Sequence, residues 1–178
     1  LVVDEIQTGF GRTGKMFASE HWNLEPDILC AAKGIASGLP LGAMIARSDI
    51  STWPRGTHGS TFGGNPMAAA IAREALKVLI DEKMIENSAT MGAYFLEKLR
   101  GLKSPWIKEV GGKGLWIGLE LTEAAGGARR FCEALRDKQL LCKETHVHTI
   151  RFAPPLNVTK DELDWAFTRI EAVFRELA

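Results

Sequence analysis

The sequence predicts an α/β fold in which part of a mostly parallel sheet is followed by a smaller α+β domain. In residues 1–82, short continuous apolar runs are separated by glycine-rich turns, which is typical of strands buried on both faces in parallel sheets. In residues 83–178, one strand alternates apolar and polar residues, as half-buried antiparallel strands do. Amphipathic helices flank that strand. We therefore expect two domains that join near residue 82.

Three strands and one helix are expected in the first part. The apolar runs at residues 1–3, 27–32 and 41–46 predict the strands. The helix begins at Pro66, because Asn65 can cap it and proline is favoured at the first helical position. Its 3-4 apolar spacing predicts a single buried face, made of Ala68, Ile71, Ala72, Ala75, Leu76 and Leu79.

The second part is expected to hold three helices and two strands. The patterns predict helices over residues 83–100 and 128–138 and strands over residues 115–121 and 149–152. The last helix has the strongest signals, since Thr159 and Glu162 form a capping box directly before it. One apolar stripe follows, made of Leu163, Ala166, Phe167, Ile170, Phe174 and Leu177.

The composition limits the classes of molecule that we expect this protein to bind. The 178 residues carry 22 basic and 22 acidic side chains, so the zero net charge gives no electrostatic basis for binding nucleic acid or an anionic membrane. No apolar run approaches the roughly 20 residues of a membrane span. Three cysteines, an odd count, argue against a disulfide framework and for a reducing, cytoplasmic location. The first predicted strand begins at residue 1, and Leu1 is not methionine. We therefore expect a truncated chain.

A glycine motif at residues 9–14 (Gly-Phe-Gly-Arg-Thr-Gly) matches the pattern of dinucleotide-binding loops. In such loops the first glycine follows the strand directly, and an acidic residue ends the next strand. Here residues 4–8 intervene and the next strand ends in Lys33. The motif therefore lacks both features of a dinucleotide-binding loop. An oxidoreductase stays a weak alternative, in which Lys33 would contact the 2′-phosphate of a dinucleotide.

An acid and a lysine each follow a predicted buried strand. Asp4 and Lys33 should reach the same edge of a parallel sheet, where ligands bind in α/β folds. Small apolar neighbours would desolvate the amine of Lys33 and favour its neutral, nucleophilic form. Asp4 would then face another cation, such as the pyridinium nitrogen of pyridoxal phosphate. An ordinary salt bridge between the two is an equal alternative. Glu5 points the other way along the strand, so we expect a structural role for it.

A glycine-rich turn at residues 59–66 runs into the start of the predicted helix. Its backbone amides, the helix dipole and the hydroxyls of Ser60 and Thr61 could bind a phosphate group. A tight loop with a helix cap is the commoner explanation when such a motif stands alone.

Polar residues also surround the predicted strand at residues 149–152. Arg151 is the one charge among apolar neighbours there, and from the residues alone we prefer its pairing with the C-terminal helix. His146 and His148 could share one face of a strand, but no cysteine or carboxylate cluster joins them, so we expect no metal site.

Taken together, these segments resemble the class III (ornithine and ω-amino acid) aminotransferases, which are fold-type I pyridoxal-phosphate (PLP) enzymes. The resemblance runs through nearly the whole chain. The segments that carry it are residues 2–14 (Val-Val-Asp-Glu-Ile-Gln-Thr-Gly-Phe-Gly-Arg-Thr-Gly), 26–28 (Pro-Asp-Ile), 32–34 (Ala-Lys-Gly), 58–66 (His-Gly-Ser-Thr-Phe-Gly-Gly-Asn-Pro) and 149–156 (Thr-Ile-Arg-Phe-Ala-Pro-Pro-Leu).

The resemblance implies a role for each matching residue. Lys33 matches the lysine that binds PLP covalently and then moves a proton between the substrate carbon and the cofactor. Asp4 matches the partner of the pyridine nitrogen, and Gln7 matches the neighbour of the phenolic oxygen. Thr61 matches a threonine that reaches the phosphate of the other subunit's cofactor, which implies a homodimer. Arg151 matches the arginine that holds a substrate carboxylate in a bidentate contact.

Within the class, residues 140–155 look most like those of ornithine aminotransferases, which implies transfer of the δ-amino group of ornithine to 2-oxoglutarate. Acetylornithine and 4-aminobutyrate aminotransferases are the close alternatives, and the aminomutases share the same scaffold. The family's phosphate loop and ring-stacking aromatic lie upstream of the strand that begins here at Leu1. The alternative from another class is therefore a non-catalytic truncated remnant or dimerisation module.

Overall fold

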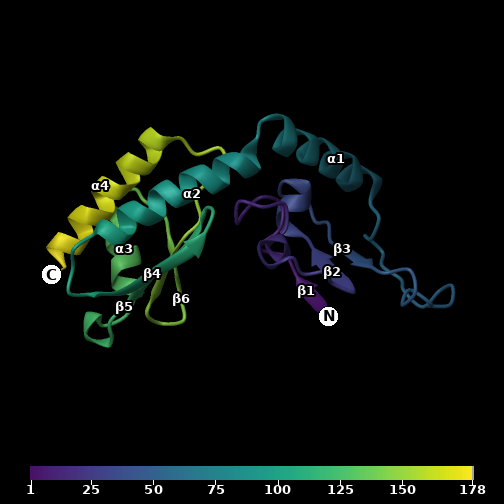
Figure 1. The fold of residues 1–178 in the computed structure, drawn as a ribbon, viewed down its shortest axis with the longest axis horizontal. Helices are drawn as coiled ribbons and strands as arrows, with labels where there is room; N and C mark the ends of the chain where they lie inside the picture. Colours follow the sequence, from purple (N-terminus) through teal and green to yellow (C-terminus); the bar gives the residue numbers. More distant parts are fainter. Residues whose placement is uncertain (178) are drawn as a thin grey trace. The chain divides into compact units, whose positions relative to one another are not determined.

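The structure is a computed structural model that describes residues 1–177, and the chain divides into two compact units, Leu1–Glu86 and Asn87–Ala178 (Figure 1). The first unit contains β1 (Val2–Asp4), β2 (Ile28–Ala31), β3 (Ala43–Ala46), α1 (Pro66–Asp81) and two short 3-10 helices, Ala18–Trp22 and Lys33–Ala36. The helix α2 (Met84–Gly101) begins at the end of this unit. In residues 1–177, no helix is both long enough and apolar enough to cross a membrane.

The first unit is built on a three-stranded sheet in the order β1-β2-β3. β1 and β2 are parallel, as expected, and the long connection over residues 5–27 permits this arrangement. β3 is antiparallel to β2, so this part of the sheet, expected to be mostly parallel, is mixed. The link between β2 and β3 contains only one short 3-10 helix, too little for the crossover that a parallel pair requires.

The strands of the first unit are also less buried than their apolar sequences predict. Val2, Met44 and Ile45 each expose more than half of their surface, and Ala31 is the buried strand residue in this unit. The expectation of strands buried on both faces is therefore wrong for residues 1–86 taken by themselves. β1 and β3 are both edge strands, and each leaves apolar side chains uncovered.

The helix α1 begins where the sequence predicts. The side chain of Asn65 accepts hydrogen bonds from the amides of Met67 (2.9 Å) and Ala68 (3.1 Å), and Pro66 occupies the first turn. The helix packs against the 3-10 helix Lys33–Ala36, and its buried residues are Ala68, Ala72 and Leu79. Part of the expected apolar face is buried in this way, whereas Ile71 is exposed.

The second unit is built on a four-stranded antiparallel sheet in the order β4-β5-β7-β6. Its strands are β4 (Ile107–Lys113), β5 (Trp116–Leu121), β6 (Lys143–Thr145) and β7 (Thr149–Phe152). β5 and β7 confirm the predicted strands. The sequence did not predict β4 and β6, which are the edge strands. Glycines, charges and an irregular register obscure β4, and β6 is short and polar.

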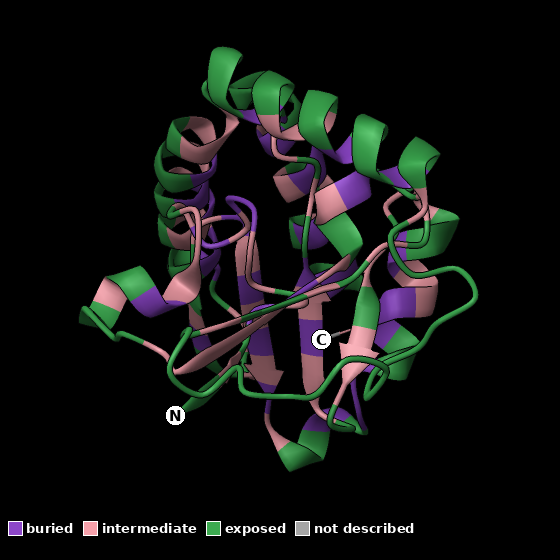
Figure 2. Ribbon diagram, turned by 90° about the vertical axis from the view of Figure 1, so that its right-hand side faces the viewer, coloured by how far each residue is buried: buried purple, intermediate pink, exposed green. Residues whose placement is uncertain are grey.

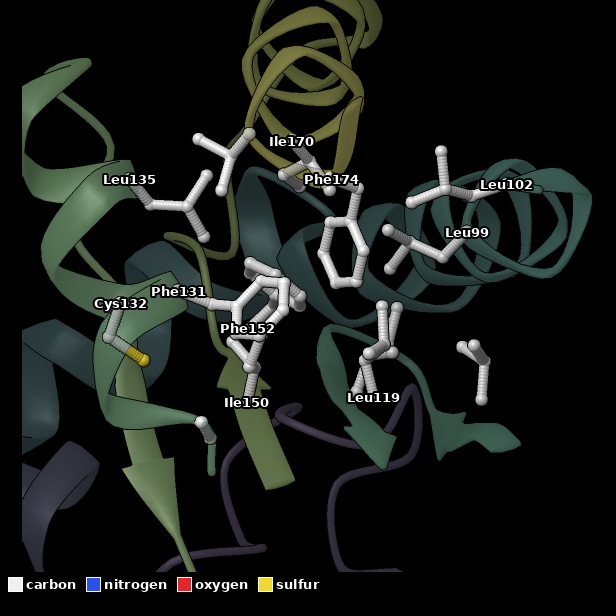
Figure 3. Packing of buried hydrophobic residues seen from close by; sticks show 14 of the residues in the cluster. Leu99, Leu102, Leu119, Phe131, Cys132, Leu135, Ile150, Phe152, Ile170 and Phe174 are labelled. Carbon is white, nitrogen blue, oxygen red and sulfur yellow. The ribbon is translucent and has the colours of Figure 1, made fainter. Parts of the chain in front are cut away.

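Three helices cover the apolar side of this sheet: α2, α3 (Arg129–Asp137) and α4 (Lys160–Glu176). Along β5, buried residues alternate with half-buried ones, as the period-two pattern predicts (Figure 2). The predicted capping box of α4 is present, with the Thr159 amide donating to Glu162 (2.8 Å) and the Glu162 amide donating to Thr159 (3.3 Å). The core includes Leu99, Leu119, Phe131, Leu135, Ile150, Ile170 and Phe174 (Figure 3).

Candidate active site

Asp4 and Lys33 lie at the same edge of the first sheet. Asp4 is the last residue of β1 and pairs in register with Cys30 of the parallel strand β2. Lys33 follows the end of β2 by two residues and opens the 3-10 helix Lys33–Ala36. Since the carboxyl ends of parallel strands face the ligand crevice in α/β folds, this edge is the place where a bound group would meet both side chains.

The Asp4 carboxylate is oriented by a backbone amide that lies two residues later in the chain. Its Oδ1 atom accepts a hydrogen bond from the amide of Ile6 at 2.9 Å. Within residues 1–177, neither Asp4 nor Lys33 takes part in an ion pair, so the alternative of an Asp4–Lys33 salt bridge is not found. The carboxylate is exposed and directed by one main-chain contact, which suits a group that receives a cationic ligand.

The backbone of Lys33 is strained. Its φ is +48°, in the left-handed region that favours glycine, and for other residues such a conformation costs of order 1–3 kcal/mol. Backbone strain of this kind concentrates at ligand sites. The Lys33 side chain is exposed, which corrects the expectation that small apolar neighbours desolvate its amine.

Glu5, immediately after Asp4, anchors the loop beside the site. It is fully buried and accepts hydrogen bonds from the hydroxyl of Thr8 and the amides of Ala18 (3.0 Å) and Ser19 (2.8 Å). Burial alone would raise the pKa of Glu5, but these hydrogen bonds outweigh it and hold the pKa below its usual value. The structural role expected for Glu5 is confirmed.

The glycine motif at residues 9–14 is part of the same support. A side chain at Gly9 would come within 2.8 Å of the Glu5 carbonyl oxygen, so the close approach requires glycine. Phe10 is buried with a φ of +58°, and its side chain lies against Gly34, next to Lys33. The motif forms turns, and no α-helix begins at it. The dinucleotide-binding interpretation therefore lacks its strand-loop-helix context.

The other predicted cofactor residues of the first unit are exposed. Gln7 lies in the turn after β1. Ser60 and Thr61 lie in the loop before α1, which extends outward from the sheet (Figure 1). There the Ser60 hydroxyl accepts a hydrogen bond from the amide of Gly63 at 2.9 Å. The structure thus brings Asp4 and Lys33 to one edge, and it holds Ser60 and Thr61 in a separate loop.

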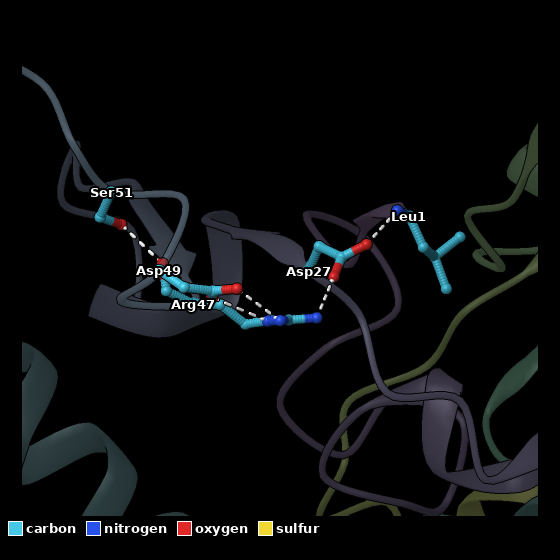
Figure 4. A network of polar contacts seen from close by, with 5 residues as sticks. All are labelled: Leu1, Asp27, Arg47, Asp49 and Ser51. Atoms are coloured by element: carbon cyan, nitrogen blue, oxygen red, sulfur yellow. Dashed lines mark hydrogen bonds and ion pairs between the residues drawn. The ribbon is translucent and has the colours of Figure 1, made fainter.

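The opposite end of the sheet is closed by charged contacts. Arg47, directly after β3, contacts Asp27, directly before β2, at 2.8 Å and Asp49 at 2.6 Å. Leu1 and Ser51 complete this network (Figure 4). The charges are exposed and bind one another, so this end holds β2 and β3 together while the end with Asp4 and Lys33 remains accessible.

Arg151 belongs to the second unit and lies on β7. Its neighbours Ile150 and Phe152 point into the core beneath the helices, so Arg151 points to the other face of the sheet. Within residues 1–177, it makes no ion pair and no side-chain hydrogen bond, so the expected pairing with the C-terminal helix is wrong.

A hollow of about 270 Å³ lies beside Arg151. Gly118, the register partner of Arg151 on β5, carries no side chain that could fill it. Thr145 and His146 lie at its rim, and the remaining lining residues are Gly111, Gly112, Trp116 and Ile117. An unpaired guanidinium beside a hollow with hydroxyl and imidazole groups is suited to bind a carboxylate. The sequence alone did not reveal this arrangement, because β4 and β6 were not recognised.

Comparison with known proteins decides the family. The family model described as aminotransferase class III matches residues 1–174. The chain belongs to this family. Its architecture is accordingly that of fold-type I PLP transferases, and Asp4, Lys33 and Arg151 lie in the segments that carried the resemblance.

Proteins similar to this class III aminotransferase chain include two ornithine aminotransferases and one acetylornithine aminotransferase. The ornithine aminotransferase of Brevibacillus brevis is 55% identical over 175 residues, which are 97% of this chain and 43% of that protein. The ornithine aminotransferase of Toxoplasma gondii, whose structure shows partial occupancy of PLP at the active site, superposes with a TM-score of 0.95 at 42% identity, over 99% of this chain and 43% of that one. The acetylornithine aminotransferase from Elizabethkingia anophelis superposes with a TM-score of 0.92 at 39% sequence identity, over 98% of this chain and 47% of that one. This chain thus spans less than half the length of each.

Proposed function

We propose that this chain carries the lysine, the ring-nitrogen acid and the carboxylate-binding arginine of a PLP-dependent aminotransferase that moves the δ-amino group of ornithine to 2-oxoglutarate. The observation that carries the proposal is the placement of Asp4 and Lys33 at the carboxyl ends of two adjacent parallel strands in a class III chain. The ornithine specificity is supported by the 55% identity to the Brevibacillus brevis enzyme.

The residues at this edge fit PLP. An exposed carboxylate held by a main-chain amide can pair with a protonated pyridine nitrogen, and an exposed lysine amine can bond to an aldehyde carbon. Gln7 would lie near the phenolic oxygen. From their separate loop, Ser60 and Thr61 would donate hydrogen bonds to a phosphate group, which for Thr61 is that of the other subunit's cofactor. When bound, PLP supplies an electron sink that makes a proton on the substrate carbon removable.

Lys33 and Arg151 then act on the substrate. In its free amine form, Lys33 takes the proton from the substrate carbon at Nζ and returns it during transfer. Arg151 holds the carboxylate of the keto acid in a charged, bidentate contact, since no group within residues 1–177 competes for its guanidinium.

We further propose that the active form is a homodimer in which Thr61 reaches the neighbouring site. Two features support this. Thr61 lies in an outward loop with exposed apolar side chains around it, Phe62 at 78% exposure and Met67 at 63%. Apolar surface of this kind marks protein–protein contacts. A reducing, cytoplasmic location is part of the same proposal, and the unbridged state of Cys30, Cys132 and Cys142 supports it.

A chimera tests the function. The matched 175-residue segment of the Brevibacillus brevis enzyme is replaced by this chain, and ornithine, acetylornithine and 4-aminobutyrate are compared as donors to 2-oxoglutarate. We expect transfer with ornithine to exceed that with the other two donors. Borohydride reduction in the presence of PLP should leave a pyridoxyl label on the Lys33 peptide. Lys33→Ala in the same chimera is the matched control and should abolish both signals.

Each alternative gives a different result. Preference for acetylornithine or 4-aminobutyrate would keep the aminotransferase and change its substrate. A folded chimera that binds PLP at another lysine, or not at all, would refute the proposal and favour the non-catalytic module. Retained activity in Lys33→Ala would show that another amine carries the chemistry.

A further inference from the structure

A second cation lies beside Arg151 on the outer face of the second sheet, which is the face opposite its core. Lys143 of β6 and Arg151 of β7 are register partners in an antiparallel pair. Residues directly opposite each other project from the same face, with Cβ atoms about 4.5–5.5 Å apart. Ile150 and Phe152 point into the core, so both cations lie on the outer face. Lys143 is exposed there.

The acidic side chains of β5 and β6 are bound to other residues and do not neutralise this pair. Glu144, the next residue on β6, points to the core side of the sheet and contacts Arg129 of α3 at 2.8 Å. Glu120 of β5 contacts Lys108 of β4 at 2.6 Å. Within residues 1–177, neither cation of the pair forms an ion pair. Like charges directly opposite each other in a sheet are destabilising, so a bound anion would relieve a repulsion here.

The surroundings of Arg151 differ on its two sides. Towards β5, its register partner is Gly118, which itself pairs with Gly111 of β4, and both glycines line the hollow. Towards β6, its register partner is Lys143. Thr145 shares a strand face with Lys143 and also lines the hollow. A carboxylate bound to Arg151 would therefore have open space on one side and an ammonium group on the other.

We propose that Lys143 is a second carboxylate-binding residue, which acts with Arg151 on the carboxylate that adjoins the carbonyl carbon of the keto acid. This inference rests on the proposed aminotransferase function. The planar guanidinium of Arg151 makes two parallel hydrogen bonds to this carboxylate. The ammonium of Lys143, a compact charge on a flexible stem, donates a third to one of the same oxygens. Because the anion between the cations offsets their repulsion, a keto acid is favoured over an uncharged carbonyl compound of the same size.

Equilibrium binding tests Lys143 separately from catalysis. The chimera with the Brevibacillus brevis enzyme, loaded with PLP and without an amino donor, is titrated by calorimetry with 2-oxoglutarate or with 2-oxopentanoate, which has a single carboxylate. We expect Lys143→Gln to raise the Kd of both keto acids roughly 2- to 5-fold, as for an exposed charge pair, and Lys143→Arg to restore most of the affinity. Lys138→Gln removes a lysine that is paired with Glu176, and this matched control should leave both Kd values unchanged.

A double variant tests whether the two cations share one carboxylate. In Lys143→Gln with Arg151→Ala, the loss of 2-oxoglutarate affinity should be smaller than the product of the two single losses, because without Arg151 the carboxylate is no longer held within reach of Lys143. The unfolding midpoint of Lys143→Gln should equal or exceed that of the parent, since the substitution removes a repulsion.

Several results would overturn the proposal. An effect of Lys143→Gln on 2-oxoglutarate but not on 2-oxopentanoate would assign the ammonium to the other carboxylate. Unchanged binding in Lys143→Gln, an equal effect of Lys138→Gln, or no keto-acid binding by the parent chimera would also contradict it. A lowered unfolding midpoint in Lys143→Gln would reveal a structural partner instead. Failure of the proposed function is a separate result, in which the chimera transfers no amino group from ornithine while the binding differences remain.

Discussion

Replacement of Arg151 by alanine is the sharpest test of how this chain uses its second unit. The guanidinium faces the hollow and makes no ion pair or side-chain hydrogen bond within residues 1–177. β7 is held by its backbone pairing to β5 and β6 and by the buried Ile150 and Phe152. Arg151→Ala should therefore leave the free energy of unfolding within about 0.5 kcal/mol of the parent.

The expected loss in catalysis follows from the contact that disappears. A hydrogen bond to a charged group contributes about 1.5–3 kcal/mol, and each 1.36 kcal/mol corresponds to a factor of ten. The kcat/KM for 2-oxoglutarate should then fall by roughly 10- to 150-fold, mostly through KM, because the carboxylate is held in both the ground and the transition state. Arg151→Lys should recover only part of this, since lysine cannot make the bidentate contact.

The assay is steady-state transfer from ornithine to varied 2-oxoglutarate in the chimera with the Brevibacillus brevis enzyme. Arg136→Ala is the control, because it removes an exposed cation from the same unit whose ion pair is with the adjacent Asp137. Unchanged KM in Arg151→Ala, or an equal effect of Arg136→Ala, would refute the reasoning. A large loss of stability would also contradict it, since it would reveal a structural partner.

Three further predictions concern stability. Glu5→Gln should lower the unfolding free energy at neutral pH by about 2 kcal/mol, because it weakens charged hydrogen bonds in a buried site. The low pKa of Glu5 in the folded chain gives stability that is full above the usual value of 4.5 and is lost as pH falls through the folded pKa, so the urea midpoints of parent and variant should converge as the pH falls below the folded pKa. Gly92→Ala should lower the free energy of unfolding, measured with urea, by roughly 2 kcal/mol or more, since its Cβ would lie 2.1 Å from the backbone of Gly114. Gly101→Ala meets nothing within 4 Å and should not destabilise the chain. Thr159→Ala removes the capping box of α4 and should cost about 1 kcal/mol in thermal or urea unfolding, and an unchanged midpoint would show that the cap contributes nothing.

The fold was predictable where sequence signals are local. The caps at Asn65 and Thr159 and the alternation of β5 depend on neighbouring residues, and the structure confirms each. The edge strands β4 and β6 were missed because their stability comes from pairing with a partner strand rather than from their own apolar content. The direction of β3 was missed for a related reason, since it depends on the length and path of the connection.

The candidate site was predictable to a similar depth. Asp4 and Lys33 each follow an apolar run that predicts a strand. Because the carboxyl ends of parallel strands lie at the same edge of a sheet, the sequence was enough to predict that the two residues lie together. The positive φ of Lys33 and the hollow beside Arg151 depend on packing between segments distant in sequence. No local pattern encodes such contacts, so only the structure could reveal them.

The strained lysine and the buried glutamate are parts of one arrangement. A left-handed backbone at Lys33 costs of order 1–3 kcal/mol and persists only where neighbouring contacts enforce it. Those contacts come from the loop anchored by Glu5, since the Glu5 carboxylate binds the Ala18 amide, Phe17 stacks edge-on with Phe10 at 5.6 Å, and Phe10 lies against Gly34. Each charged hydrogen bond to Glu5 contributes about 1.5–3 kcal/mol, enough to offset the strain. Glu5 thus helps to position Lys33, although these two side chains form no ion pair with each other.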